Sequence, residues 1–224
     1  PVLTISAAGV DENNAVNVSG TITDPGTLDT HVVVIDWGGS EGTSAAAVSG
    51  NTFTASHLYL DDDPTGTASD VYTITATATD DDAGVGSVST DVTVNNVAPT
   101  GSIAADAFNS EVTVTFGDVG SLDTHSATVD WGDGLGAVSI GAVTSPFTDS
   151  NVYSAPGVYD VTVTVTDDDT GAITFTTQVI GVGDCDCTKE ESYWKKQFDP
   201  KQIEKGNTDF SAEELDALLS VVNF

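Results

Sequence analysis

The sequence predicts an all-β fold made of two tandem antiparallel β-sandwiches, followed by a short C-terminal helical tail. Three observations lead to this prediction. A long segment is repeated, the strand-like runs alternate apolar and polar residues, and helical periodicity is absent before the tail. We expect the first sandwich at residues 1–97, the second at 98–183 and the tail at 184–224.

The repeat consists of two long matches. "DPGTLDTHVVVIDWGG", which begins at Asp24, returns 94 residues later as "DVGSLDTHSATVDWGDG", which begins at Asp118. "VYTITATATDDDAG", from Val71, returns 87 residues later as "VYDVTVTVTDDDTG", from Val158. The second copy is therefore shorter between the two matches, and an insertion confined in this way predicts a surface loop in the first copy.

Strict alternation identifies the strands. In "VYDVTVTVT" the apolar side chains of Tyr159, Val161 and Val163 fall on one face and the threonines on the other. Alternation over this length is typical of a strand that is buried on one side. In the first copy we expect strands at about residues 16–23, 31–37, 71–79 and 87–94.

The charge of the chain is strongly negative and unevenly distributed. The sequence has 35 acidic residues against 5 lysines and no arginine, a formal net charge of −30, and residues 1–183 contain 25 acidic residues and no lysine or arginine. Such a chain repels nucleic acid, which we exclude as a partner. No apolar run reaches the ~20 residues of a membrane span. Two interpretations of the charge stay open: a highly soluble surface, or carboxylates that divalent cations neutralise.

The motifs of the second copy resemble a known family. "VDWGDG" at 129–134, followed by "YSAPGVYDVTVTVTD" at 153–167, resembles the signature of PKD domains. These are immunoglobulin-like sandwiches of bacterial and archaeal surface proteins, secreted hydrolases and polycystin ectodomains. The first copy departs from the signature, because "DWGGS" lacks the second aspartate. The resemblance covers about residues 1–183 and implies two immunoglobulin-like sandwiches in a secreted or cell-surface protein.

The implied layout gathers acidic loops at the ends of each sandwich. The linker "NNVAPTG" at 95–101 is short and contains a proline, so we expect a stiff joint between the copies. This layout is similar to cadherin junctions, which calcium rigidifies. The expected ligands at the far end of the first copy are Asp24, Asp29, Asp80 and Asp82. Those expected at the joint are Asp11, Glu12, Asp61, Asp62, Asp63, Asn95, Asp118, Asp123, Asp167 and Asp169.

Calcium is the expected cofactor, because it binds about six to eight oxygens and tolerates irregular geometry. Zinc and copper would require histidine or cysteine ligands. An alternative stays open for Asp24, Asp29 and their equivalents, which could instead cap turns through backbone hydrogen bonds. No serine or cysteine nucleophile is associated with His31 or His125, so we expect no enzyme.

Two features suggest self-association. Val32 and Val34 point outward where the second copy has serine and threonine, which is either incidental or part of a contact patch. The tail has an apolar stripe at helical spacing that would pack within the chain or on another subunit, formed by Leu215, Leu218, Leu219 and Val222. The leading hypothesis is a non-catalytic, calcium-stiffened structural subunit of an extracellular filament, sheath or surface layer. The alternative is an accessory binding or spacer module of a larger secreted hydrolase or adhesin.

Overall fold

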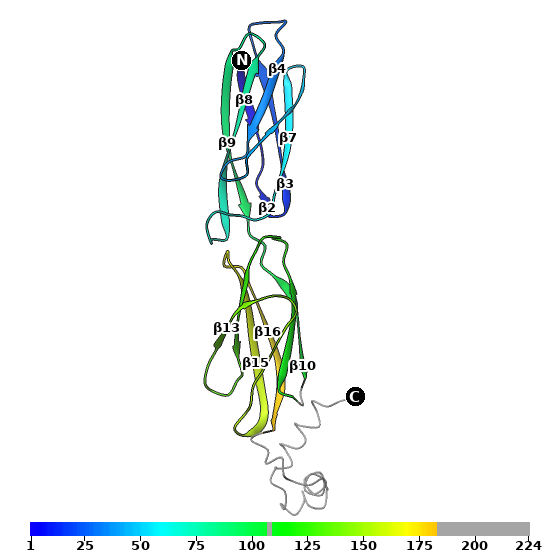
Figure 1. Ribbon diagram of the computed structural model, residues 1–224, viewed down its shortest axis with the longest axis vertical. Coiled ribbons are helices and arrows are strands. Elements are labelled where there is room, and N and C mark those ends of the chain that lie inside the picture. The colour runs from blue at the N-terminus through cyan, green and yellow to red at the C-terminus, as the bar shows by residue number, and fades with distance from the viewer. Residues whose placement is uncertain (107–108, 183–224) are drawn as a thin grey trace, which may run out of the picture. The chain divides into compact units, whose positions relative to one another are not determined.

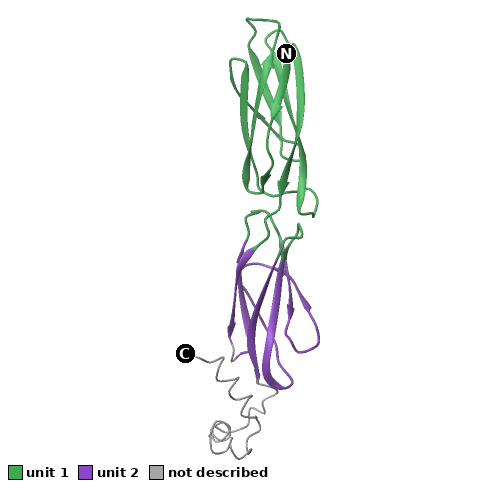
Figure 2. Cartoon of the chain, turned by 180° about the vertical axis from the view of Figure 1, so that it is seen from behind, with its two compact units in different colours: residues 1–99, 118–124, 166–172 green, residues 100–117, 125–165, 173–224 purple. Residues whose placement is uncertain are grey.

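The alternating segments form strands in the computed structural model, which describes residues 1–106 and 109–182 (Figure 1). Contacts divide the chain into two units, coloured separately in Figure 2. Unit 1 comprises Pro1–Pro99 together with the segments Asp118–Thr124 and Thr166–Ala172. Unit 2 comprises Thr100–Gly117, His125–Val165 and the chain from Ile173 onward. Two loops of the second sequence repeat thus belong to unit 1.

Unit 1 contains two sheets. One has the strand order β1-β3-β7-β6, and its strands are Val2–Ser6, Asn14–Thr23, Thr52–Tyr59 and Ala47–Ser49. The other has the order β2-β9-β8-β4-β5, and its strands are Val10–Asp11, Val85–Asn95, Ser69–Asp80, His31–Asp36 and Thr43–Ala45. Neighbouring strands are antiparallel except β2 and β9, which run parallel.

The core of unit 1 consists of the inward-facing residues of both sheets. Val16 and Phe53 from one sheet are buried together with Ile35 and Ile74 from the other. The residues that alternate with them point outward, and among these Thr75 and Ser89 of neighbouring strands are hydrogen-bonded at 2.9 Å. Burial on one face and threonine on the other explain why these runs fold as strands.

Unit 2 repeats this arrangement with fewer strands. One sheet has the order β10-β11-β14, formed by Thr100–Asp106, Glu111–Gly117 and Phe147–Ser150. The other has the order β13-β12-β15-β16, formed by Val138–Val143, His125–Asp130, Pro156–Asp167 and Ala172–Val182. Val114, Val129 and Val163 are among the residues buried between the sheets.

One buried hydrogen bond recurs in both repeats and joins the two sheets of each. The hydroxyl of Tyr59, which ends β7, donates to the carbonyl of Trp37 at 2.7 Å. The hydroxyl of Tyr153 donates to the carbonyl of Trp131 at 2.8 Å. All four residues are buried, so each bond replaces the hydration that these polar groups lose on folding.

The expected fold class needs one correction. The described residues are all-β and contain no helix, so the helical tail is not part of the fold that the structure establishes. Residues 184–224, including the expected stripe of Leu215, Leu218, Leu219 and Val222, lie outside the described residues. No segment of residues 1–106 or 109–182 forms a helix that could cross a membrane.

Candidate metal site

Six carboxylates from four loops meet in unit 1. We call them the acidic cluster: Glu12, Asp61, Asp62, Asp123, Asp168 and Asp169. The loops follow β2 and β7, precede β12, and connect β15 to β16. Residues that are far apart in the sequence therefore share one small volume.

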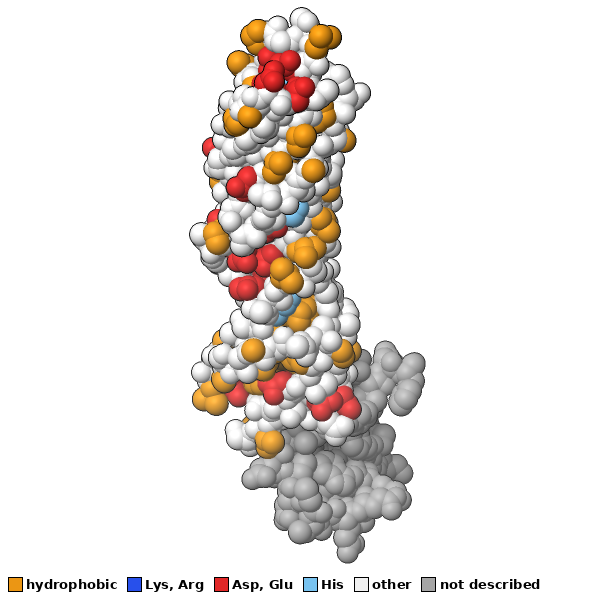
Figure 3. All heavy atoms as spheres, turned by 45° about the horizontal axis from the view of Figure 1, so that its top comes forward, with side chains coloured by type: hydrophobic (Ala, Val, Ile, Leu, Met, Phe, Trp, Pro, Cys, Tyr) orange, Lys and Arg blue, Asp and Glu red, His pale blue; other side chains and the backbone are white. Residues whose placement is uncertain are grey.

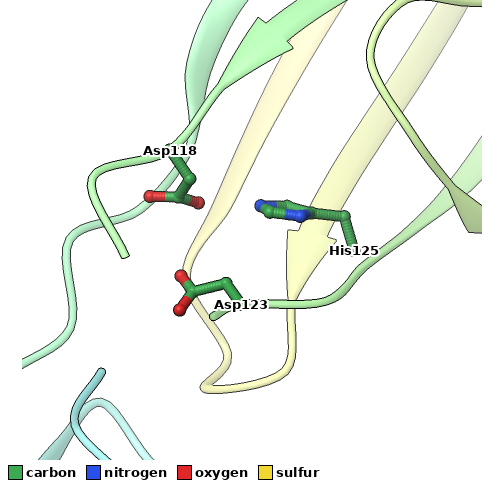
Figure 4. Close-up of side chains that lie close together, drawn as sticks. All are labelled: Asp118, Asp123 and His125. Carbon is green, nitrogen blue, oxygen red and sulfur yellow. The ribbon is translucent and has the colours of Figure 1, made fainter. Parts of the chain in front are cut away.

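Oxygens of the cluster approach each other in overlapping groups. Within each group, one carboxylate oxygen per residue lies within 4.8 Å of the others. The groups are Glu12–Asp61–Asp123, Asp61–Asp62–Asp169 and Asp123–Asp168–Asp169. Asp123 also groups with Asp118 and His125, and Figure 4 shows these three side chains turned toward one another. Ligands of one calcium ion, each about 2.3–2.6 Å from it, lie at such separations.

Backbone hydrogen bonds fix the loops that carry these side chains. The Glu12 amide donates to the Asn95 carbonyl at 2.9 Å, and the Val97 amide donates to Glu12 Oε1 at 2.7 Å. The Ser121 amide donates to the Leu60 carbonyl at 3.1 Å. The backbone thus holds Glu12 in place and joins the loop after β7 to the loop before β12.

Burial without partners is the distinctive property of the cluster. The side chains of Glu12 and Asp62 are 0% exposed. Seven buried oxygens have no hydrogen-bond partner among the described residues: Glu12 Oε2, Asp61 Oδ1, both of Asp62, Asn96 Oδ1 and both of Asp123. Buried polar groups in proteins are nearly always paired, and buried charges are paired or bind metal. The described residues contain no lysine or arginine, and the face drawn in Figure 3 shows groups of carboxylates among neutral side chains and histidine.

Burial and mutual repulsion raise the pKa values of five carboxyls of the cluster, those of Glu12, Asp61, Asp62, Asp123 and Asp169. Burial is the largest cause for Glu12, whose pKa rises from 4.5 to about 8, with the charges of Asp123 and Asp62 adding to the shift. The pKa of Asp62 and that of Asp123 rise to about 7, and the pKa of Asp169 rises to about 6, again chiefly through burial. Without a cation the cluster therefore binds protons near neutral pH.

The turn at Gly120 leaves no room for a side chain beside these oxygens. A Cβ at this position would overlap the carboxylates of Asp123 and Glu12. A Cβ at Gly117, in contrast, would meet no atom within 4 Å. Gly120 therefore allows the backbone to approach the carboxylates closely, which is a common use of glycine at ligand sites.

Other expected ligands lie at the edge of the cluster or away from it. Asn95 Nδ2 donates to Asp11 Oδ1 at 3.2 Å, and both residues are exposed. Asp63 is also exposed, and its carbonyl accepts a hydrogen bond from the Tyr72 hydroxyl. Neither Asp11 nor Asp63 belongs to the groups of close oxygens among the described residues.

Asp167 and Asp168 have different places from those expected. Asp167 Oδ2 accepts from Asn96 Nδ2 at 3.1 Å and Oδ1 accepts from the Asp169 amide at 3.1 Å, so Asp167 supports the turn. Asp168, which was not among the expected ligands, joins the group of Asp123 and Asp169. The position of Asp168 in the "DDD" triplet was the available signal, but the triplet alone does not indicate which carboxylate turns inward.

The acidic group at the other end of unit 1 has a different character. Asp24, Asp29 and Asp80 also offer oxygens within 4.8 Å of one another. However, Asp24 Oδ1 accepts the Gly26 amide at 3.0 Å, and Asp80 Oδ1 accepts the Asp82 amide at 3.0 Å. Among the described residues, none of the oxygens of these side chains is both buried and unpartnered. Turn capping, the alternative interpretation, describes the bonds of Asp80 and of Asp24 Oδ1, whereas Asp24 Oδ2 lies 3.2 Å from His31 Nε2.

Comparisons with known proteins add structural likenesses but no family. No protein-family model matches the sequence, and no curated protein matches it. The PKD1 domain of Vibrio anguillarum Epp is similar in structure over 40% of this chain and 99% of its own, with 24% identity and a TM-score of 0.29. A tetra-tandem repeat in the extending region of a large adhesion protein is similar over 79% of this chain and 48% of its own, with 20% identity and a TM-score of 0.45.

A cytokine receptor complex is also similar, over 81% of this chain and 98% of its own, with 10% identity and a TM-score of 0.32. All three TM-scores are below 0.5, so these likenesses establish neither a family nor a function for the chain.

Proposed function

We propose that this chain is a non-catalytic structural module of an extracellular assembly and that calcium ions bound in the acidic cluster stiffen it. The observation that carries the proposal is the set of seven buried, unpartnered oxygens in a part of the chain without lysine or arginine. When these carboxylates are ionised, a bound cation is the remaining means of neutralising their negative charge.

The ligand chemistry favours calcium over other cations. The cluster offers carboxylate oxygens, and its overlapping groups have no regular geometry. Calcium accepts about six to eight oxygens in irregular arrangements, whereas magnesium needs a near-ideal octahedron and retains water. Zinc and copper prefer nitrogen and sulfur, and His125 is the one such ligand in the groups around the cluster in the described residues.

Calcium bound here would restrain segments that are distant in the sequence. Glu12 and Asp62 belong to residues 1–99, whereas Asp123 and Asp169 belong to the segments 118–124 and 166–172. The backbone of both segments continues into strands of unit 2. An ion with ligands from both sets would therefore restrict the motion of the chain where it passes from one unit to the other. This restriction is what we mean by stiffening.

Self-association through the outer face of β4 is the second part of the proposal. Val32 is 63% exposed and Val34 is 40% exposed. Val32 pairs with Thr79, which pairs with Val85 on the next strand, and Val85 is 64% exposed. Three exposed valines on one face form a small apolar patch, which suits contact with another subunit.

The test is a thermal melt combined with light scattering on the full chain, in excess calcium and in excess chelator. Saturation to about 100 times the Kd stabilises the folded state by about 2.7 kcal/mol per site, which raises the Tm by roughly 5–10 °C in a chain of this size. Asp62→Asn should reduce this rise, and Asp91→Asn, which alters an exposed aspartate on β9, should not. A Tm that is equal in calcium and chelator would refute the calcium site. A calcium-dependent Tm at constant molar mass would refute the assembly.

A further inference from the structure

The two repeats place one segment differently, and the difference leaves a sheet edge of unit 2 without a neighbouring strand. Strand registers establish the correspondence, because the pair Val18–Ala55 of unit 1 recurs 94 residues later as Val112–Asp149. In unit 1 the segment after β4 changes sheets, so that β5 pairs with β4 and β6 pairs with β7. In unit 2 the equivalent segment is β13, which pairs with β12 from Val138 to Val143. β14, the counterpart of β7, therefore has β11 as its one neighbour among the described strands.

The hydrogen-bond pattern identifies the backbone groups of β14 that face away from β11. The Asn151 amide donates to the Ser110 carbonyl at 3.1 Å, which continues the register of β11 and β14 by one pair. Hydrogen-bonded pairs alternate along an antiparallel ladder, so Asp149 also bonds to β11, whereas Thr148 and Ser150 direct their N–H and C=O groups outward. Both of these residues are exposed. The edge of β14 can therefore accept a further strand.

Unit 2 also lacks an apolar side chain that the neighbouring strand supplies in unit 1. Val48 of β6 pairs with Phe53 of β7 and packs against the core. The residue 94 positions later is Ala142, which is exposed and pairs with Ser126 of β12 instead. No side chain of β13 therefore takes the place of Val48 beside β14.

A cavity of about 440 Å³ lies along this edge, and we call it the β14 groove. Its lining combines Asp149 of β14 with apolar residues that include Val129, Val138 and Ile140. Among the described residues, none donates a hydrogen bond to the carboxylate of Asp149. The groove thus offers an apolar lining and one carboxylate without a counter-charge.

We propose that the edge of β14 binds an extended segment of a partner protein as an added antiparallel strand, with a lysine or arginine opposite Asp149 and an aliphatic residue opposite Phe147. Side chains opposite each other lie on the same face, so both would enter the β14 groove. In an antiparallel strand the residue opposite Asp149 comes two positions before the one opposite Phe147. The recognised pattern is therefore basic-x-aliphatic, with the main-chain hydrogen bonds supplying affinity and the two side chains specificity.

Charge complementarity favours a different protein over a second copy of this chain. Residues 1–183 contain 25 acidic residues and no lysine or arginine, so contact between the described parts of two copies would place no basic side chain opposite Asp149. An inward-pointing charge on an edge strand also opposes pairing with strands that cannot neutralise it. The proposal is independent of calcium, because none of the residues that line the groove belongs to the acidic cluster.

The experiment measures amide hydrogen exchange by NMR in the ¹⁵N-labelled full chain, with and without synthetic peptides. The probe is the unit 1 segment 44–50 carrying Ala46→Lys, because residue 46 precedes Val48 by two positions, and the control peptide carries Ala46→Glu. We expect the lysine peptide to slow exchange of the Thr148 and Ser150 amides severalfold or more. The glutamate peptide should bind about tenfold more weakly, the effect of losing one charge-assisted hydrogen bond.

Three outcomes would overturn the proposal. Equal binding of the two peptides would show that Asp149 does not select a basic residue. An absence of protection at Thr148 and Ser150 would show that no strand is added at this edge. Slow exchange at both amides before any peptide is added would show that another part of the chain, or a second copy, already occupies the edge.

Two variants test the geometry of the complex. Thr148→Pro removes an outward amide that pairs with no described strand, and edge strands tolerate proline at such positions, so the fold should survive while peptide binding is lost. Asp149→Ala introduces the residue that Ala55 provides in unit 1 and should abolish the preference for the lysine peptide. Asp91→Ala, at an exposed aspartate of unit 1, is the matched control and should retain it. A preserved preference in Asp149→Ala would overturn the proposal even if Thr148→Pro fails to fold.

Discussion

Glu12 and Asp123 offer carboxylate oxygens within 4.8 Å of each other and of Asp61, although neither Glu12 Oε2 nor either oxygen of Asp123 has a hydrogen-bond partner among the described residues. Two ionised carboxylates at this separation repel each other strongly in a buried site. The pair is therefore the most sensitive place at which to test whether a cation belongs in the acidic cluster.

Glu12→Gln should have opposite effects with and without calcium. At pH 8 in chelator, the substitution removes a buried repulsive charge while its amide oxygen can still accept the Val97 amide, so the Tm should rise or stay constant. In calcium, the loss of an anionic ligand should lower the ion affinity by about tenfold or more and reduce the Tm. Calorimetric titration and thermal melts measure both effects. A fall in Tm of the same size under both conditions would indicate a structural role without an ion.

The calcium-free protein should become less stable as pH rises, and saturating calcium should remove this pH dependence. The folded-state pKa of Glu12 is raised to about 8 and those of Asp62 and Asp123 to about 7, so the calcium-free folded state binds more protons than the unfolded state between about pH 4.5 and 8. Its free energy of unfolding should therefore fall as pH rises through this window. Saturating calcium keeps the carboxylates ionised and should remove the fall, while calcium affinity increases with pH. Melts at intervals of one pH unit test this, and a calcium-free Tm that increases from pH 5 to 8 would contradict it.

The acidic cluster should bind at least two calcium ions. Its close groups overlap at Asp61, Asp123 and Asp169, and one ion would leave most of the charge of six carboxylates uncompensated. Native mass spectrometry of the full chain should therefore show a step of two or more ions that Asp62→Asn reduces. A single bound ion that Asp62→Asn removes would confirm the site and refute the predicted stoichiometry.

Gly120→Ala should weaken calcium binding without changing any ligand. The added Cβ would overlap the carboxylates of Glu12 and Asp123, and overpacking of this kind costs about 1–3 kcal/mol. Gly117→Ala is the matched control, because its Cβ would meet no atom within 4 Å. Calorimetry should show about tenfold or greater loss of affinity in the first variant and little change in the second. Equal affinities in both variants would mean that the backbone at Gly120 does not have to approach the ions.

Replacing the valines of β4 should reduce self-association. Val32→Ser with Val34→Thr introduces the residues that occupy the equivalent positions in the second repeat, so the strand itself should be preserved. Analytical ultracentrifugation in calcium should show a smaller assembly for this variant. Val2→Thr, at a residue that is 70% exposed on β1, is the control and should assemble normally. Unchanged assembly of the double variant would exclude the β4 face as the contact.

The strands could be predicted from the sequence because the alternation that specifies each strand lies within the strand itself. Alternation around Val161 and Val163 specifies both the strand and its buried face, and the strand expected at 31–37 is observed at His31–Asp36. The proximity of Glu12 and Asp123, which belong to different repeats, was expected from the order of strands in each sandwich together with the short linker at 95–101.

The remaining features depend on contacts that no local pattern encodes. Glu12 is fully buried because the loops after β2 and β7 and the segment at Gly120 enclose it together, whereas Asp63, which has the same chemistry, is exposed.

The bond from Tyr59 to Trp37, and its counterpart from Tyr153 to Trp131, connects the two sheets of each sandwich, a connection that small extracellular domains often make with a disulfide. Residues 1–183 contain no cysteine, so this part of the fold depends on no oxidant and needs no thiol exchange to find its correct partner. These hydrogen bonds form as the sandwiches fold, and reducing agents do not break them.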